Sequence, residues 1–390
     1  MISVETALEK ILALATVTEV ETAPLADAAG RVLAQDVAAR RDQPPFPSSA
    51  MDGYALRAAE AAVGARFDVV GTSAAGHGFA GTVGPGQAVR IFTGAPVPDG
   101  ADRVVIQEDV TRDGDRITLS DTLGGGPHVR PLGVDFRTGD TVAAPRLLRP
   151  EDVALLAAMN IPEIPVRRRP VVALIATGDE LVMPGETPAP DQIIASNSFG
   201  LKAMLEAAGA EARLLPIARD NAASLKTAFA LAEEADLIVT IGGASVGDHD
   251  LVAPVAEELG LERAFYKVAM RPGKPLMAGR LGGAAMLGLP GNPVSAMVCG
   301  QLFMLPLVRA MMGLPHSPAP RRSRPLEADI GPNGPREHYM RARLTETGIA
   351  AFDSQDSSLL TVLAEADALL VRPPGDGARK AGTLVDYIAL

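Results

Sequence analysis

The chain has 390 residues, of which 47% are hydrophobic and 21% are charged, and its formal net charge is −11. This length exceeds one ordinary hydrophobic core, so we expect two to four domains. The acidic balance argues against nucleic-acid binding, which needs a basic surface. The single cysteine, Cys299, excludes a disulfide within the chain, and we expect a buried thiol in a reducing cytoplasm. We expect neither a signal peptide nor an apolar run that could span a membrane.

Residues 3–15 are predicted to form a helix, because Ser3 suits an N-cap and Leu8, Ile11 and Leu12 repeat at helical spacing. The proline-rich stretch 43–47 then interrupts regular structure. Four short β-prone runs, 67–70, 88–92, 103–107 and 116–119, follow between Gly- and Pro-rich turns, and they predict a small β-domain over 43–140. A second helix is predicted from Pro150 onward. If the two helices pack together, 1–42 and 141–168 form one bipartite, helical linking domain into which the β-domain is inserted.

Residues 169–316 alternate between strand-like and helix-like segments, which predicts right-handed βαβ crossovers and a doubly wound parallel sheet. Residues 317–390 return to β texture after a proline-rich linker and predict a small, separate C-terminal β-domain. The expected fold class is therefore a multidomain protein with a central α/β domain and two β-domains.

Within the α/β region, five apolar runs are each followed directly by a loop rich in Gly or charged residues. The runs and loops are VVALIA then TGDE (177–180), ARLLPIA then RDN (219–221), DLIVTI then GGASVGDHD (242–250), FYKVAM then RPGK (271–274), and AAMLGL then PGNP (290–293). If the runs are parallel strands of one sheet, all five loops lie along its carboxyl edge, where open α/β sheets bind ligands.

The glycine-rich loop after DLIVTI is the strongest candidate for anion binding. The backbone N–H groups of Gly242, Gly243, Ser245 and Gly247 can converge on a phosphate or similar oxyanion, although a tight turn that merely needs positive φ has the same pattern. Asp250 follows closely, and a carboxylate beside an anion site repels the anion unless a cation bridges them. We therefore expect Mg²⁺ or another hard divalent cation.

Glu180 and Asp220 follow two other strands of the same predicted edge. Taken alone, each acid is more often a helix cap or a solvated charge. Their shared edge favours metal binding or the positioning of a leaving group.

Two proline-bounded turns supply further candidates. Lys267, Arg271 and Lys274 place cations on a stiff segment that can meet an anion, and a surface charge cluster is the alternative. In the second turn, Asn292 suits an N-cap and Pro293 the first helical position, so the following helix, with Ser295 in its first turn, offers free N–H groups.

Histidines at metal-ligand spacing, a G-x-S-x-G elbow and a Walker A loop are all missing from the sequence. Zinc hydrolases, nucleophilic hydrolases and P-loop NTPases are thereby disfavoured. In the β-domain, SAMDGYA (49–55) and FTGAPVP (92–98) would each pass as ordinary turns on their residues alone.

Taken together and in this order, the motifs resemble the molybdopterin molybdenumtransferase family, known as MoeA in bacteria and as the E domain of gephyrin in animals. The resemblance rests on SAMDGYA, FTGAPVP, the segment 133–135, ATGDEL, the Asp220 loop, GGASVGDHD, RPGKP and LPGNPVSA. It implies a four-part architecture: a bipartite elongated domain, an inserted β-domain, a molybdopterin-binding α/β domain and a C-terminal β-barrel.

The resemblance also implies a reaction, in which molybdenum from molybdate enters adenylylated molybdopterin and AMP is released with the help of Mg²⁺ or another divalent cation. It implies a homodimer whose active site combines the β-domain of one subunit with the α/β domain of the other. Acids in catalytic roles are implied at Asp52, Glu180, Asp220 and Asp250, and we expect Asp220 and Asp250 to hold the divalent cation. Substrate contacts are implied at Thr93, Arg130, Asp135, Gly242, Gly243, Ser245, Gly247, Lys267, Arg271, Lys274, Pro275, Pro290, Asn292, Pro293, Ser295, Arg341 and Ser357, with Ser358 as the alternative to Ser357.

The chain departs from the family pattern in two places. Arg271 stands where the family usually has Lys, and residues 130–135 carry fewer charges than in relatives. Two other functions stay open: a molybdopterin adenylyltransferase, which shares the α/β domain, and a gephyrin-like scaffold. A preference for tungstate over molybdate also stays open, because both oxyanions are tetrahedral and nearly equal in size. Implied partners are the adenylyltransferase and apo-molybdoenzymes.

Overall fold

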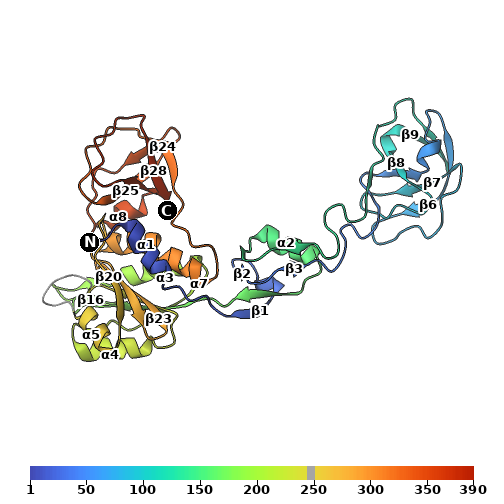
Figure 1. Ribbon diagram of the computed structural model, residues 1–390. Coiled ribbons are helices and arrows are strands. Elements are labelled where there is room, and N and C mark those ends of the chain that lie inside the picture. The colour runs from blue at the N-terminus through green and yellow to red at the C-terminus, as the bar shows by residue number, and fades with distance from the viewer. Residues whose placement is uncertain (244–250) are drawn as a thin grey trace.

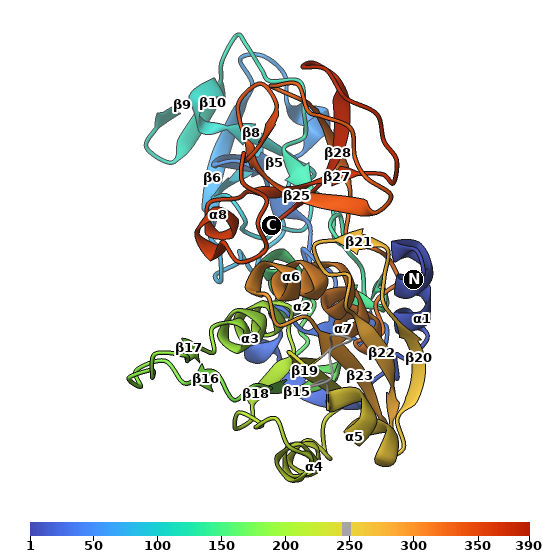
Figure 2. The same cartoon turned by 90° about the vertical axis from the view of Figure 1, so that its left-hand side faces the viewer.

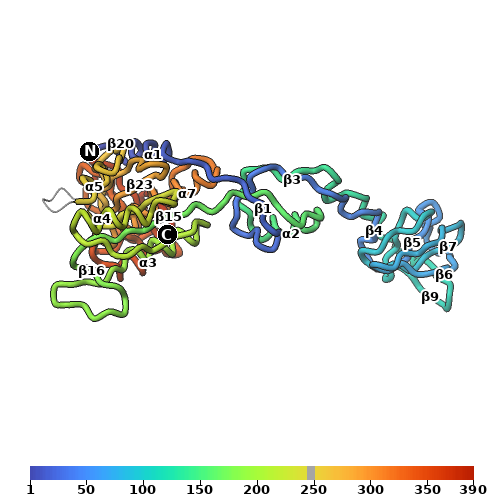
Figure 3. The backbone as a smooth tube through the Cα atoms, turned by 90° about the horizontal axis from the view of Figure 1, so that it is seen from below, coloured from blue at the N-terminus to red at the C-terminus, as the bar shows by residue number. Residues whose placement is uncertain are grey.

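The computed structural model describes residues 1–243 and 251–390. The described chain is elongated: an α/β domain and a C-terminal β-domain lie together at one end, a linking domain lies in the middle, and a second β-domain lies at the far end (Figure 1, Figure 3). The predicted class of a multidomain α/β plus β protein is confirmed.

The α/β domain is built on a six-stranded sheet in the order β18-β15-β19-β23-β22-β20. Its strands are β15 (Val171–Ala176), β18 (Glu211–Leu214), β19 (Leu237–Ile241), β20 (Glu262–Tyr266), β22 (Met277–Leu281) and β23 (Ala284–Leu289). The first four in spatial order are parallel, as predicted. The sheet is nevertheless mixed, because β22 runs antiparallel to both of its neighbours. Because β22 is antiparallel to both β23 and β20, β20 runs parallel to β23 and the other three strands. The five predicted runs therefore still end at one edge of the sheet.

Side chains of the central strands alternate between two apolar cores, and helices cover both faces of the sheet. Val172, Leu174 and Val239 face a core shared with α1 (Val4–Leu12), α3 (Asn197–Ala207) and the helical segment from α6 (Pro293–Cys299) to α7 (Leu305–Met311). Ala173 and Ile175 face the core under α4 (Ala222–Leu231) and α5 (Val252–Glu258). This arrangement is the predicted doubly wound domain.

The N-terminal helix belongs to the α/β domain. Ser3 caps α1 as predicted, since its Oγ accepts a hydrogen bond from the N–H of Thr6 at 3.1 Å. The helix contacts α7, β20 and β22, and Ile11 is fully buried there. The prediction that this helix packs on the helix from Pro150 is therefore wrong: α2 (Pro150–Ala158) packs in a different core, that of the linking domain.

The linking domain consists mainly of strands, where the sequence had suggested helices. It contains a four-stranded sheet in the order β1-β14-β2-β13 and a separate pair, β3-β12. The strands are β1 (Val20–Pro24), β2 (Val32–Leu33), β3 (Val37–Ala38), β12 (Thr141–Val142), β13 (Arg146–Leu147) and β14 (Glu163–Arg167). Every pairing with β1, β2 or β3 joins residues before 43 to residues after 140, so the domain is made of two chain segments.

The far β-domain contains a six-stranded sheet in the order β8-β5-β7-β6-β10-β9 and a pair, β11-β4. Its strands are β4 (Ser48–Ser49), β5 (Gly53–Leu56), β6 (Arg66–Ser73), β7 (Gln87–Ile91), β8 (Arg103–Ile106), β9 (Val110–Asp113), β10 (Arg116–Leu119) and β11 (Val129–Arg130). The four β-prone runs of the sequence correspond to β6, β7, β8 and β10.

The C-terminal domain closes into a small barrel. Its strands are β24 (Arg322–Pro325), β25 (Glu337–Leu344), β26 (Ile349–Ala351), β27 (Ala368–Arg372) and β28 (Leu384–Ala389), with α8 (Leu360–Ala364) beside them. A bridge between Leu326 and Ile349 brings β26 back to the end of β24. One more strand, β21 (Met270–Arg271), leaves the α/β segment and pairs with β25, so that Arg271 lies opposite His338. The two domains are thus joined through backbone pairing.

The helical segment Pro293–Met311 corrects one expectation from the sequence. Its length and its mean hydropathy of 1.5 are sufficient for a membrane span, contrary to the prediction that no such run exists. In the structure, 78% of this window is buried inside the protein, as in the core helix of a soluble protein.

Candidate functional site

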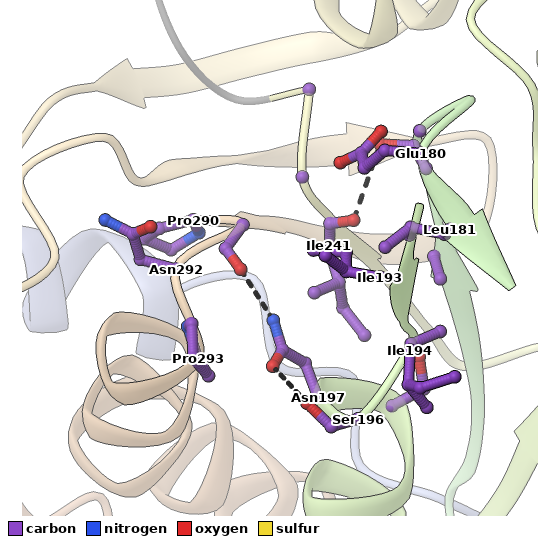
Figure 4. Close-up of a pocket in the computed structure, with 18 of the residues that line it drawn as sticks. Glu180, Leu181, Ile193, Ile194, Ser196, Asn197, Ile241, Pro290, Asn292 and Pro293 are labelled. Carbon is purple, nitrogen blue, oxygen red and sulfur yellow. Dashed lines mark hydrogen bonds between the residues drawn. The ribbon is translucent and has the colours of Figure 1, made fainter. Parts of the chain in front are cut away.

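A cavity of about 720 Å³ lies at the carboxyl ends of β15, β19 and β23. It is bounded by the first turn of α6 and by a two-stranded arm, β16 (Leu181–Val182) and β17 (Ile193–Ile194), as Figure 4 shows. Eight of the predicted residues line it: Glu180, Asp220, Gly242, Gly243, Pro275, Pro290, Asn292 and Pro293. Loops after four strands therefore meet at one edge, as the sequence predicts.

Gly242 and Gly243 are glycines for steric reasons. Their φ angles are +94° and +59°, and a Cβ added at either position would come within 2.8 Å of Thr177 O or 2.4 Å of Val252 Cγ2. The N–H of Gly242 donates to Leu289 O at 3.1 Å, so the sheet uses this donor and it is not free for an anion. The rest of the loop, with the predicted residues Ser245, Gly247 and Asp250, lies outside the described residues.

Glu180 and Asp220 are brought to one cavity by a set of hydrogen bonds between their two loops. The N–H of Asp220 donates to Asp179 Oδ1 at 3.2 Å, and the N–H of Asp179 donates to Asp220 Oδ2 at 3.4 Å. Arg219 Nη1 also donates to the carbonyl oxygens of Asp179 and Leu181. No Lys or Arg is found among the described residues of the lining. Two carboxylates therefore face a cavity whose described wall offers them no cation.

The turn before α6 is organised differently from the prediction. Asn292 and Pro293 occupy the predicted N-cap and first helical positions, but the Asn292 side chain makes no capping bond. Asn292 Nδ2 instead donates to Ser357 Oγ at 3.0 Å, and the N–H of Val294 donates to Ser357 O at 3.1 Å. One of the helix N–H groups expected to be free is therefore occupied. Ser295 is buried, with 5% of its surface exposed.

The three predicted cations of the segment 267–275 do not line the cavity. Lys267 has a φ of +73°, and its Nζ lies 5.3 Å from the centre of the Tyr266 ring. The N–H of Val268 donates to Lys274 O at 3.0 Å, which folds the segment back so that Pro275 reaches the cavity. Lys274 is exposed, and Arg271 lies in β21 beside the C-terminal barrel. The site is therefore divided into two parts.

The second part, which we name the arginine junction, consists of Arg271, His338 and Arg341. Arg341 is fully buried, and its Nη2 donates to Asp356 O at 2.8 Å. Its Nε and Nη1 have no hydrogen-bond partner within the described protein. Burial, aided by the charge of Arg271, lowers the pKa of Arg341. A buried guanidinium with two unused donors is a fork suited to an oxyanion, because such donors are rarely left unpaired.

His338 lies on β25 beside Arg271 and is almost fully buried. Burial, followed by the charges of Arg271, Arg341 and Arg372, lowers the pKa of His338 to about 4. The imidazole is therefore neutral near neutral pH, so the junction holds positive charge on its arginines alone.

Three predicted residues, Asp52, Thr93 and Arg130, lie in the far β-domain, whereas Asp135 directly precedes Phe136, which packs in the core of the linking domain. Asp52 accepts hydrogen bonds from the N–H and Oγ1 of Thr93, both at 2.7 Å, and the backbone bond is the main reason that the pKa of Asp52 is lowered. Arg130 pairs with Ser48, and the N–H of Asp135 donates to Gln43 O at 3.0 Å. The linking domain separates the far β-domain from the cavity within one chain (Figure 1).

Several residues at the cavity were missed in the sequence. Asn197 Nδ2 donates to Gly291 O at 2.7 Å and connects the start of α3 with the turn before α6. Ser196, Asn197 and Ser198 stand in a row at the start of α3, and this cluster of capping residues was a usable signal. Ile193 and Ile194 also line the cavity but had no such signal.

Curated proteins that resemble this chain share most of its length. "Molybdopterin molybdenumtransferase 2" of Mycobacterium tuberculosis is 38% identical over 93% of this chain and 93% of its own. "Molybdopterin molybdenumtransferase" of Haemophilus influenzae is 39% identical over 76% of this chain and 74% of its own. The chain belongs to the MoeA family. The matching family models are the MoeA N-terminal region (domains I and II) at 2–160, the probable molybdopterin binding domain at 173–310, and the MoeA C-terminal region (domain IV) at 323–390.

The fold agrees with this membership. A crystal structure of a molybdopterin biosynthesis MoeA protein from Pyrococcus horikoshii, 30% identical, matches with a TM-score of 0.84 and covers 100% of this chain and 99% of its own. In MoeA terms, the cavity lies mostly in the probable molybdopterin binding domain, whereas Arg341 and Ser358 come from domain IV.

Proposed function

We propose that the chain transfers molybdenum from molybdate to adenylylated molybdopterin, with release of AMP, in the cytoplasmic synthesis of the molybdenum cofactor. One observation carries the proposal: segment 356–358 connects an acid-lined cavity, which Ser358 lines, with a buried guanidinium that has two unpaired donors. Pro275 and Ser358 line the cavity. Arg271 lies four residues before Pro275 in the same chain segment. Arg341 donates a hydrogen bond to Asp356 O, two residues before Ser358. A nucleotide-bearing substrate and an oxyanion would meet across this boundary.

The arginine junction is suited to molybdate. Arg341 offers Nε and Nη1, and it cannot relax toward solvent because it is fully buried. Preorganised donors of this kind hold an anion without having to be reoriented when it binds. Lys274 is exposed beside Pro275 and would add a mobile positive charge at the entrance. The same donors would hold tungstate, which has the same shape and charge.

The donor set of the cavity fits a divalent cation such as Mg²⁺. Glu180 and Asp220 face a described lining that contains no Lys or Arg, and oxygen ligands are those that Mg²⁺ prefers. A group of three or more metal-ligating side chains is not found in the described residues, so water or substrate oxygens would complete the coordination. When bound, the ion would neutralise phosphate charge near these acids, and Asp250 would be a further ligand.

The β-domain would complete the site from a second copy of the chain. The hydrogen bonds from Thr93 orient Asp52 and lower its pKa, and Asp52 lies outside the described lining of the cavity in its own chain. The linking domain is tied to the α/β domain at their junction, because Arg168, which follows β14, forms two hydrogen bonds to Asp236 at 2.8 and 2.9 Å. A homodimer could therefore present Asp52, Thr93, Arg130 and Asp135 to the partner's cavity. The adenylyltransferase would supply the substrate, and apo-molybdoenzymes would receive the product.

The decisive experiment incubates the purified chain with adenylylated molybdopterin, molybdate and Mg²⁺. AMP and metal-loaded cofactor should both appear. AMP made only from ATP and unadenylylated molybdopterin would indicate an adenylyltransferase instead. Partner capture without any turnover would indicate a scaffold.

Subunit mixing tests the shared site. Asp52→Ala and Asp220→Ala chains should each be inactive, but heterodimers carry one site with both acids intact. Random mixing should therefore restore about a quarter of the wild-type activity. An active site contained in a single chain would give no recovery on mixing.

A further inference from the structure

The arm formed by β16 and β17 presents unusual apolar surface at the cavity. Ile193 is 59% exposed and Ile194 is 37% exposed, although both line the cavity. Figure 2 shows that the arm projects from the body of the α/β domain. Exposed aliphatic residues that line a concave site are typical of ligand contact.

The backbone holds these side chains in place. β17 pairs with β16 in parallel, with Leu181 opposite Ile193. The N–H of Ile193 donates to Glu180 O at 2.7 Å, and the N–H of Ala195 donates to Val182 O at 2.9 Å. Ile193 is therefore fixed directly beside the predicted catalytic acid, and the arm is more than a surface loop.

A second apolar wall faces the arm. Pro290 and Pro293 lie on one side of the cavity, with Leu181 and Ile194 on the other (Figure 4). The Asn197–Gly291 hydrogen bond connects the two sides. No aromatic side chain lies in the described lining, and its only charged groups are the carboxylates of Glu180 and Asp220.

We propose that Ile193 and Ile194 form, with Pro290 and Pro293, an aliphatic clamp for a flat, uncharged heterocycle of the substrate. The inference rests on the proposed function and names the part of the substrate that this wall holds. A neutral ring gains apolar contact on both faces, and the two carboxylates do not repel it. A free phosphate would gain no apolar contact at this wall, and the two carboxylates would repel it. Adenine and pterin share this chemistry, and separate probes distinguish them.

The test uses the full chain and equilibrium binding of two probes, AMP for adenine and pterin-6-carboxylate for the pterin ring. Ile193→Ser should weaken binding of at least one probe by about tenfold. The substitution removes the apolar contact that roughly half of the isoleucine side chain would make with the bound ring. Ile193→Leu should bind within about twofold of wild type, because apolar contact is kept. Met183→Ser, a change on the arm at a residue as exposed as Ile194 but outside the described cavity lining, should have no effect.

In turnover of adenylylated molybdopterin, Ile193→Ser should raise KM and leave kcat unchanged, as expected for lost ground-state binding. Wild-type probe affinity in both serine variants, Ile193→Ser and Ile194→Ser, would overturn the clamp. A change in their sedimentation without a change in probe binding would also overturn it and would assign the arm to a subunit interface. If the wild-type chain bound the probes but released no AMP, the proposed function would fail while the clamp stood.

Discussion

The acid-lined cavity and the arginine junction lie next to each other but differ in charge, burial and source. The cavity combines two carboxylates with aliphatic walls and comes mostly from the α/β domain. The junction combines a buried guanidinium, a neutral histidine and Arg271, and it exists only because β21 pairs with the C-terminal barrel. The carboxylates of the cavity and the arginines of the junction, which would neutralise each other in contact, therefore lie in separate parts of the site. The difference suggests two tasks, holding a nucleotide-bearing substrate and holding an oxyanion.

The largest effect is expected at the cavity. Asp220→Asn should lower the rate of AMP release by about 10³-fold, because lost charge stabilisation in a catalytic site typically has this size. Molybdate binding, measured by calorimetry, should stay as in wild type. Asp191→Asn, an exposed acid on the arm, is the matched control. Loss of molybdate affinity in Asp220→Asn would show that the two parts are one site.

The next effect is expected at the junction. Arg341→Met should weaken molybdate binding by about 100-fold, because it removes two charge-assisted hydrogen bonds. The same change should raise the free energy of unfolding by about 1–2 kcal/mol, because it removes a buried and incompletely paired charge. Arg343→Met, at an exposed arginine on the same strand, provides the control for both measurements. Unchanged molybdate affinity in Arg341→Met would remove the junction from the binding site.

A smaller effect concerns acid stability. The pKa of His338 falls from 6.5 to about 4 on folding, so the unfolded chain binds a proton that the native chain excludes. Stability is complete above the unfolded pKa of 6.5 and declines as the pH falls from there toward 4. The loss from this group should be about 2 kcal/mol between pH ~7 and pH ~5. His338→Asn should remove that part of the slope in denaturant unfolding curves; an identical slope would show that His338 is not the cause.

The smallest effect is expected for Arg271→Lys, which introduces the residue that the family resemblance implied at this position. The charge is kept but the planar fork is lost, so molybdate affinity should change by no more than about threefold. Titration calorimetry would measure it, with the exposed Arg263→Lys as control. A change of 100-fold would mean that Arg271 is a direct and geometrically demanding ligand.

Much of the α/β domain was predictable because its strands are apolar runs that end at Gly or Pro. The runs at 171–176 and 284–289 match β15 and β23 residue for residue. β22 was missed because MAGRL contains a glycine and an arginine and does not read as a buried strand. Ile193 and Ile194 were missed because a two-residue strand has no periodicity to detect.

The sequence by itself determined the central α/β domain, the two β-domains, the Ser3 cap and the common edge of the acidic and glycine-rich loops, because hydrophobic periodicity and turn residues act over a few neighbouring positions. Only the tertiary structure decided that α1 packs on the α/β domain, that β22 runs antiparallel to its neighbours, and that the strand containing Arg271 pairs with the C-terminal barrel. These outcomes depend on contacts between residues far apart in the chain. The same long-range contacts decide where the charged side chains lie. Arg341 becomes buried, and the β-domain that contains Asp52 comes to lie far from the cavity, only when the separate domains are assembled.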